Sequence, residues 1–260
     1  MNPAPVVLIH HDAAAVATAA AARLTAKVVD AQSAAGSASV VLTGGGVGIA
    51  TLRALRQAPG HQLVNWRAVD LWWGDERFLP LGHPDRNDTQ AGEALLDHVD
   101  IDWSRVHRMP GPDGPDGDDP RAAAERYAAE LATAAGAPDT AAVPAFDVLM
   151  LGVGPEGHVA SIFPESPAAV DLGIVVAVLN SPKPPPTRLS LTFTALNSAR
   201  EAWLLAAGAE KAHAVRLALT GTAPLQLPAA GVTGRAGTWW LLDEAAAAML
   251  PPGIGRPATG

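Results

Sequence analysis

The sequence predicts an α/β fold: a mostly parallel sheet with helices on both faces, doubly wound like a Rossmann domain, with a small additional β-containing part. The main observation is that short apolar runs alternate with alanine-rich or amphipathic segments along the chain, as strands and helices do in such folds. The 260 residues, 48% hydrophobic and 17% charged, supply enough apolar material for a large core. We expect one domain over residues 1–250 and a frayed tail at residues 251–260.

The first elements follow from local pattern. Val6–His10 is a short apolar run typical of a strand, and Asp12 can cap an alanine-rich helix over residues 13–28. Residues 39–42 are β-branched and indicate a second strand, which ends in a glycine run. Residues 49–55 then continue as a helix.

The middle of the chain repeats this alternation. Residues 66–73 indicate a third strand, and residues 87–99 a helix capped by Asn87 or Asp88. Residues 111–120 are rich in Pro, Gly and Asp, which is typical of an exposed loop. Residues 121–135 have high helix propensity.

The second half contains more apolar runs than helical segments. The run at residues 146–151 indicates a buried strand. Further strands are expected at residues 174–178, 189–193, 203–207 and 238–242, and helices at residues 211–219 and 243–249.

Composition excludes several classes of function. The net charge is −8 with only 18 Lys and Arg, so we expect no nucleic-acid partner, because binding to phosphate backbones needs a concentrated basic face. With no cysteine there is no disulfide, thiolate nucleophile or sulfur-ligated metal. The start has no basic region, its apolar run is too short for a signal peptide, and no stretch is long enough to span a membrane. We therefore expect a cytoplasmic protein.

The strongest chemical signal is residues 152–164, Gly-Val-Gly-Pro-Glu-Gly-His-Val-Ala-Ser-Ile-Phe-Pro, which directly follow the strand at 146–151. Glycines allow close approach of a ligand to the backbone, and the carboxyl end of a strand is where an open α/β sheet binds its ligand. Of eight histidines, His158 is the only one in a glycine-rich strand exit beside a carboxylate, Glu156. A metal site from His10 and His11 is not expected, because adjacent strand residues point to opposite faces.

The same segment also satisfies a dinucleotide-binding pattern through Gly152, Gly154 and Gly157. That function needs a long helix directly after the third glycine, and Pro164 ends any such helix early. A nucleotide cofactor is therefore disfavoured.

Two earlier strand ends carry further polar chemistry. Gly44, Gly45 and Gly46 precede a helix and suit a phosphate, or form a plain tight turn. They lack the Gly-Lys-Ser/Thr ending of a nucleoside-triphosphate loop, which favours a monophosphate. The third strand ends in Gly-Asp-Glu-Arg at residues 74–77, which is either part of a site or a solvated charged loop.

Together these segments resemble the 6-phosphogluconolactonase family, within the wider group that includes glucosamine-6-phosphate deaminases. The resemblance covers most of the chain, and its segments occur in the family's order: residues 44–45, 75–77 with Pro80, Asn87, 152–164, 184–192 with Asn197, and 208–212. Deaminases of the group carry a glutamate five positions after the motif histidine, where this chain has Phe163. The pattern here is that of the lactonase branch.

Two positions depart from the family pattern. Glu156 stands where members commonly have Asp, which changes the reach of the carboxylate by one methylene. Val47 stands where the first loop usually has a hydroxyl residue, so phosphate binding there would rest on backbone amides, with Thr43 helping.

The resemblance implies hydrolysis of 6-phospho-D-glucono-1,5-lactone to 6-phosphogluconate, in the oxidative pentose phosphate pathway, without metal or cofactor. His158 would be the general base, Glu156 would orient its ring, and Arg77 would stabilise charge or hold sugar hydroxyls with Asp75 fixing it. The positions that match substrate- or phosphate-binding segments are Thr43, Gly44, Gly45, Gly46, Asn87, Gly154, Gly157, Arg188 and Lys211.

Alternatives remain at this stage. Lys211 is either a phosphate ligand or a solvent-facing helix residue. The chain could be a deaminase or a non-catalytic sugar-phosphate sensor, although no basic helix-turn-helix segment accompanies it. A serine esterase lacks its Gly-x-Ser-x-Gly elbow, so we interpret Ser161 as a cap or packing residue. The tryptophans in predicted strands are expected in the core, and the protein is expected to be a monomer or weak homo-oligomer.

Overall fold

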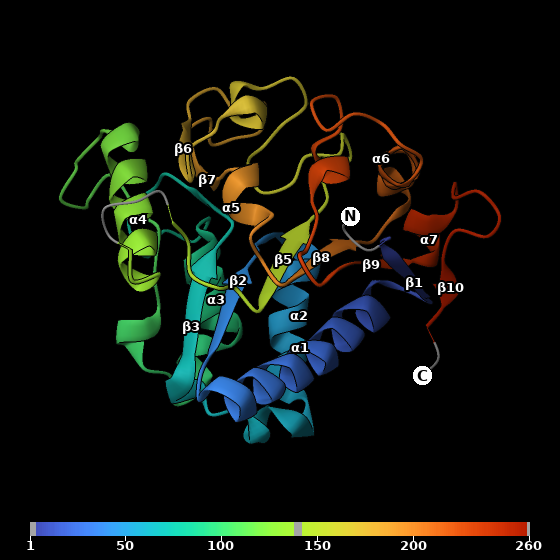
Figure 1. Cartoon of the computed structure of the whole chain (residues 1–260), viewed down its shortest axis with the longest axis horizontal. Coiled ribbons are helices and arrows are strands. Elements are labelled where there is room, and N and C mark those ends of the chain that lie inside the picture. Colours follow the sequence, from blue (N-terminus) through green and yellow to red (C-terminus); the bar gives the residue numbers. More distant parts are fainter. Residues whose placement is uncertain (1–3, 138–141, 259–260) are drawn as a thin grey trace.

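The computed structural model describes residues 4–137 and 142–258. Its central element is a seven-stranded sheet in the order β10-β1-β9-β8-β5-β2-β3, in which every paired strand runs parallel (Figure 1). Its strands are β1 Val6–His10, β2 Ala38–Leu42, β3 Val69–Trp73, β5 Val148–Gly152, β8 Glu201–Ala206, β9 Gly237–Asp243 and β10 Arg256–Pro257. The predicted α/β class with a mostly parallel sheet is confirmed.

A second sheet of three antiparallel strands, in the order β4-β7-β6, lies beyond the carboxyl end of β3. Its strands are β4 Asp75–Arg77, β6 Val175–Val178 and β7 Arg188–Leu191. This is the small additional β-containing part that the sequence predicted. Because β4 follows β3 after a single residue, Gly74, the second sheet projects from the same edge at which the parallel strands end.

Helices cover the parallel sheet, with α1 and α2 packed together below it and α5 and α6 above it in Figure 1. The α-helices are α1 Ala13–Ala35, α2 Gly45–Gln57, α3 Asn87–Ala94, α4 Pro120–Ala134, α5 Phe193–Leu196, α6 Ala212–Leu219 and α7 Glu244–Ala247. Short 3₁₀ segments lie at Pro59–Leu63, Trp66–Ala68, Leu96–His98, Trp103–Arg105, Pro167–Val170, Ala209–Lys211 and Pro228–Gly231. No helix among the described residues is both long and apolar enough to cross a bilayer.

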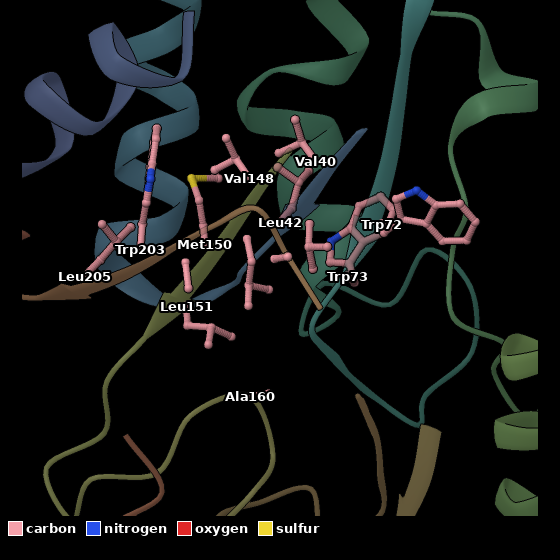
Figure 2. Packing of buried hydrophobic residues seen from close by; sticks show 14 of the residues in the cluster. Val40, Leu42, Trp72, Trp73, Val148, Met150, Leu151, Ala160, Trp203 and Leu205 are labelled. Atoms are coloured by element: carbon pink, nitrogen blue, oxygen red, sulfur yellow. The ribbon is translucent and has the colours of Figure 1, made fainter. Parts of the chain in front are cut away.

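The core lies along the inner strands, where side chains on both faces are covered (Figure 2). Val148 and Met150 on β5 and Trp203 on β8 are completely buried. Trp72 and Trp73 at the end of β3 are buried as well. Strands buried on both faces need nearly continuous apolar sequence, which explains why these segments were recognisable as apolar runs.

Several boundaries differ from prediction. The helix expected to be capped by Asn87 or Asp88 instead has Arg86 at its N-cap, and the amides of Asn87 and Asp88 donate to the carboxylate of Glu76 at 2.7 and 2.9 Å. That helix ends at Ala94 rather than residue 99. The cap is supplied from a distant strand, which local pattern does not reveal.

Other boundaries moved by a few residues. Residues 66–68, expected to begin a strand, form a 3₁₀ turn before β3, and α2 begins four residues earlier than expected, at Gly45. Within the tail that was expected to fray, Arg256 and Pro257 pair with Leu8 and Ile9 of β1. The last two residues of that tail lie outside the described part of the chain.

One polar cluster ties α4 to the back of β3. The ring of His107 stacks on Trp72 with centroids 3.7 Å apart, its Nδ1 lies 2.6 Å from Oε1 of Glu130, and its Nε2 lies 3.5 Å from Oδ1 of Asp70. We call this arrangement the His107 clasp. Burial lowers the pKa of His107, but the two carboxylates outweigh it, so the net shift of the pKa is upward.

Candidate active site

A cavity of about 320 Å³ opens where the carboxyl ends of the parallel strands meet the small antiparallel sheet. Five chain segments line it: the loop after β2, strand β4 with the start of α3, the loop after β5, the segment leading into β7, and the loop after β8. Segments far apart in sequence meet here because their strands are neighbours in the order β8-β5-β2-β3. Such a crevice is the usual ligand site of an open parallel sheet.

The loop after β2 presents the start of α2 to the cavity. Gly44 is the N-cap of α2, and no acidic residue stands in the first helical turn. The free amides at a helix N-terminus and the helix dipole together favour an anion. Gly45 has a φ of 77°, which favours glycine, and a Cβ on Gly44 would lie 1.9 Å from Oδ1 of Asn87. Both glycines are therefore required by the geometry of the loop.

Thr43 joins this loop to its neighbour. Its Oγ1 accepts a hydrogen bond from the amide of Gly152 at 3.3 Å, and the residue is buried at the wall of the cavity. The hydroxyl therefore holds two strand-exit loops together.

His158 faces the cavity from the loop after β5. A Cβ on Gly154 would lie 1.9 Å from its Nδ1, so the ring occupies the space that any other residue at 154 would fill. On another side Phe163 stacks on the ring, with centroids 4.6 Å apart. Gly157 has a φ of 85° and donates to the carbonyl of Gly154, but it does not line the cavity. Its contribution is the turn that returns His158 toward Gly154.

Two charged side chains, Glu156 and Lys183, influence the pKa of the His158 imidazole. Nδ1 of His158 lies 3.2 Å from Oε1 of Glu156, and Oε2 of Glu156 accepts a hydrogen bond from Nζ of Lys183 at 3.0 Å. Burial lowers the pKa of His158 and dominates, while Glu156 raises that pKa and Lys183 lowers it. The net pKa lies below 6.5, so the ring is neutral near pH 7 and can accept a proton.

The carboxylate of Glu156 stays ionised. Burial raises its pKa, but hydrogen bonds from its own amide and from Lys183, with charge attraction from His158 and Lys183, bring the pKa below its ordinary value. Glu156 does not itself line the cavity. It therefore acts on the ring of His158 rather than on a ligand.

Asp75 and Arg77 lie on the same face of β4, but Asp75 does not hold Arg77 as expected. Oδ2 of Asp75 accepts a hydrogen bond from Oγ of Ser161 at 2.6 Å and lies 3.9 Å from Nη1 of Arg188. Nη1 of Arg77 donates instead to the carbonyl of Asp85 at 2.6 Å and to Oδ1 of Asn87 at 2.9 Å. Ser161, expected as a cap or packing residue, positions Asp75.

Four cationic side chains gather in an acidic protein. The register of the antiparallel pair places Arg77 directly opposite Arg188, and both line the cavity with Lys183 and Lys211. Nε and Nη2 of Arg188 donate to carbonyls of the preceding proline-rich segment, which leaves Nη1 facing Asp75. Like charges placed directly across a strand pair are unfavourable. Such a concentration is therefore suited to an anionic ligand.

Lys211 lies at the cavity rather than in solvent. Its side chain is 19% exposed, it ends a 3₁₀ turn, and burial lowers its pKa. The solvent-facing alternative raised by the sequence is therefore wrong.

Sequence reasoning missed Lys183, although this residue directly precedes the proline run that leads to Arg188. It included Glu76 in the motif at residues 74–77 but gave this residue no role. Glu76, on the opposite face of β4 from the cavity, accepts from the amides of Arg77, Asn87 and Asp88, and burial raises its pKa to about 7. No local signal distinguishes it from Asp75. Within the part of the chain that the structure covers, no three His, Asp or Glu side chains gather to hold a metal ion.

Comparison with known proteins identifies relatives of this chain. The family model "Glucosamine-6-phosphate isomerases/6-phosphogluconolactonase" matches residues 11–240. The 6-phosphogluconolactonase of Streptomyces coelicolor is 56% identical over 100% of both chains, and that of Mycobacterium tuberculosis is 49% identical over 94% of this chain and 97% of its own. The solved 6-phosphogluconolactonase from Trypanosoma brucei superposes with a TM-score of 0.80 at 29% identity, covering 96% of this chain and 100% of its own. The resemblance seen in the motifs is confirmed: this chain belongs to the glucosamine-6-phosphate isomerase/6-phosphogluconolactonase family.

Proposed function

We propose that the protein hydrolyses 6-phospho-D-glucono-1,5-lactone to 6-phosphogluconate, the reaction after which its close relatives are named. The observation that carries the proposal is a partly buried, neutral histidine facing a cavity that also holds two guanidinium groups and a helix N-terminus. Hydrolysis of a lactone that carries a phosphate requires a base to activate water and an anion-binding surface to hold the phosphate.

In the proposed reaction, water is activated by His158. Nδ1 faces Glu156, so Nε2 is the nitrogen available to remove a proton from water. The water oxygen then bonds to the lactone carbonyl carbon, and the carbonyl electrons move to its oxygen. When that carbonyl reforms, the bond between the carbon and the ring oxygen breaks, and the imidazolium returns its proton to the departing ring oxygen. General-base assistance of this kind contributes about 10²–10⁴-fold.

The cations divide between the two ends of the substrate. Arg77, held by Asp85 and Asn87, is suited to stabilise the developing oxyanion or to hold sugar hydroxyls. Arg188, Lys211 and the amides of residues 44–46 are suited to the phosphate. Val47 supplies no hydroxyl, and the start of α2 offers free amides in its place.

The deaminase alternative is disfavoured by the surroundings of the ring. A deaminase of this group orients its histidine with a glutamate at the position of Phe163, and here an aromatic ring stacks on the imidazole instead. A sensor that binds without catalysis is the remaining alternative, and it would have no use for a neutral base beside the ligand cations.

One assay separates these functions. Freshly generated 6-phosphogluconolactone is followed for acid release above its spontaneous hydrolysis, and glucosamine 6-phosphate is followed in parallel for ammonia. We expect acid release only. The variant His158→Ala should lose 10²–10⁴-fold in turnover while it still binds 6-phosphogluconate. Ammonia release would support the deaminase, and binding without turnover in the unmodified protein would support the sensor.

We further propose that the protein acts in the cytoplasm as a monomer or weak homo-oligomer, without a nucleic-acid partner. The support against a nucleic-acid partner is the net charge of −8, with only 18 Lys and Arg in the chain. Sedimentation velocity across a range of protein concentrations tests the proposed oligomeric state.

A further inference from the structure

The carboxylate of Glu156 lies between the imidazole of His158 and the ammonium group of Lys183. One oxygen lies 3.2 Å from Nδ1 of His158, and the other accepts a hydrogen bond from Nζ of Lys183 at 3.0 Å. The contact with Lys183 is a hydrogen bond, whereas the contact with His158 is not. Nδ1 of His158 is buried and has no hydrogen-bond partner in the described part of the chain. A buried ring nitrogen without a hydrogen-bond partner costs free energy, so a hydrogen bond to Nδ1 of His158 would stabilise the site.

Lys183 is built to move its charged end while its backbone stays in place. The carbonyl of Lys183 accepts from Nη2 of Arg188 at 3.2 Å, and its amide donates to Oγ of Ser181 at 3.2 Å. The side chain itself is 40% exposed and forms an ion pair with Glu156. A long flexible side chain on a fixed backbone can redirect its ammonium group at little cost.

A ligand phosphate in the cavity would give the ammonium group of Lys183 a second anionic partner. Lys183 lines the cavity with Lys211, and the charge of Lys183 disfavours protonation of Lys211, so the two ammonium groups repel each other. A dianion between them would remove this repulsion and would attract Lys183 away from Glu156.

We propose that Lys183 is a substrate-operated latch: it holds Glu156 in the free protein and moves to the phosphate of the bound substrate, which frees Glu156 to pair with His158. The identity of the ligand rests on the proposed lactonase function. The latch makes Lys183 a positioning residue that acts on the base through Glu156. It would make full basicity of His158 depend on a phosphate in the cavity.

Few other charged groups lie near His158 that could change its pKa. The ring is faced by Glu156 and Lys183, by the more distant carboxylate of Asp75, and by the uncharged ring of Phe163. Asp75 is already engaged by Ser161. Movement of Lys183 therefore acts on the pKa of His158 in two ways, because it frees Glu156 and removes the charge of Lys183 from the ring, and both changes raise this pKa.

The test is the titration of His158 by NMR, with and without saturating glucitol 6-phosphate, a stable polyol that has a phosphate and no carboxylate. In the unmodified protein we expect the ligand to raise the pKa of His158 by about one unit. In Lys183→Met the pKa of His158 should already be higher without ligand, and the ligand should raise it by less than half as much. Lys183→Arg keeps the charge and should retain most of the ligand-induced rise.

The matched control is Lys27→Met. Lys27 also pairs with a glutamate, Glu201, at 2.7 Å, and its side chain is similarly exposed at 36%, but it lies on α1 away from the cavity. This variant should titrate like the unmodified protein. This control shows whether the loss of a lysine–glutamate pair elsewhere in the protein changes the titration of His158.

Equal ligand-induced shifts in the unmodified protein and Lys183→Met would overturn the latch, and so would a failure of the polyol phosphate to bind. The two proposals fail separately. A protein that hydrolyses no lactone but still shows the expected titrations retains the latch and loses the lactonase function. A protein that hydrolyses the lactone with equal shifts retains the function and loses the latch.

Discussion

Gly154 offers a direct test of the position of the catalytic ring. In Gly154→Ala the new Cβ would lie 1.9 Å from Nδ1, 2.1 Å from Cε1 and 2.8 Å from Cγ of His158. Ordinary contact begins at 3.4 Å, so the ring must retreat by about 1.5 Å in this close-packed site. The backbone of Gly154 lies outside the left-handed region, so alanine can take its conformation.

The size of the effect follows from that displacement. A misplacement of about 1 Å in a catalytic group costs on the order of 10²-fold. We therefore expect turnover to fall about 10²-fold, which corresponds to roughly 2.7 kcal/mol. The three atoms nearest to the new Cβ all belong to His158 and none to the cavity cations, so the affinity for 6-phosphogluconate should change little.

Initial rates on fresh 6-phosphogluconolactone, corrected for spontaneous hydrolysis, measure turnover, and calorimetry measures product binding. Gly92→Ala is the matched control, because Gly92 lies inside α3 and its Cβ would make an ordinary contact, 3.4 Å from Oδ2 of Asp97. It should keep its activity and gain up to about 1 kcal/mol from helix propensity. A folded Gly154→Ala protein with unreduced turnover would refute the position assigned to the base.

Three other predictions concern charge. The acid limb of kcat/KM should lie below pH 6.5, because burial lowers the pKa of His158. In Glu156→Gln this limb should move to still lower pH, because the charge that raises the pKa of His158 is gone. A limb that moves to higher pH in this variant would contradict the assigned role of Glu156. Arg188→Ala should raise KM by roughly 10-fold or more, as expected for lost charged hydrogen bonds, and an unchanged KM would remove Arg188 from the site. The raised pKa of His107 means that its clasp stabilises the fold fully below pH 6.5 and loses this contribution as pH rises through the folded-state pKa. The Tm deficit of His107→Gln should therefore be larger at pH 6 than at pH 9, and a deficit independent of pH would contradict the clasp.

Much of the fold could be predicted because its determinants are local. The apolar run at β5 and the glycines after it lie within a few residues of each other, and Asp12 caps α1 as expected, with Oδ1 accepting from the amide of Ala15 at 2.8 Å. The start of α3 at Asn87 was predicted correctly, but its cap could not be, since the capping group is the carboxylate of Glu76, eleven residues before Asn87. A cap supplied by another element leaves no mark in the local pattern.

The sequence by itself determined that glycine-rich turns follow buried strands and that one of them holds Glu156 beside His158, because turn chemistry and strand periodicity act over a few residues. Tertiary structure alone decided which charges meet there. Ser161 reaches Asp75 across 86 residues, and Lys183 reaches Glu156 across 27. Such pairs depend on strand order and on the register that sets Arg77 opposite Arg188. Both are properties of the packed sheets, in which residues distant along the chain become neighbours.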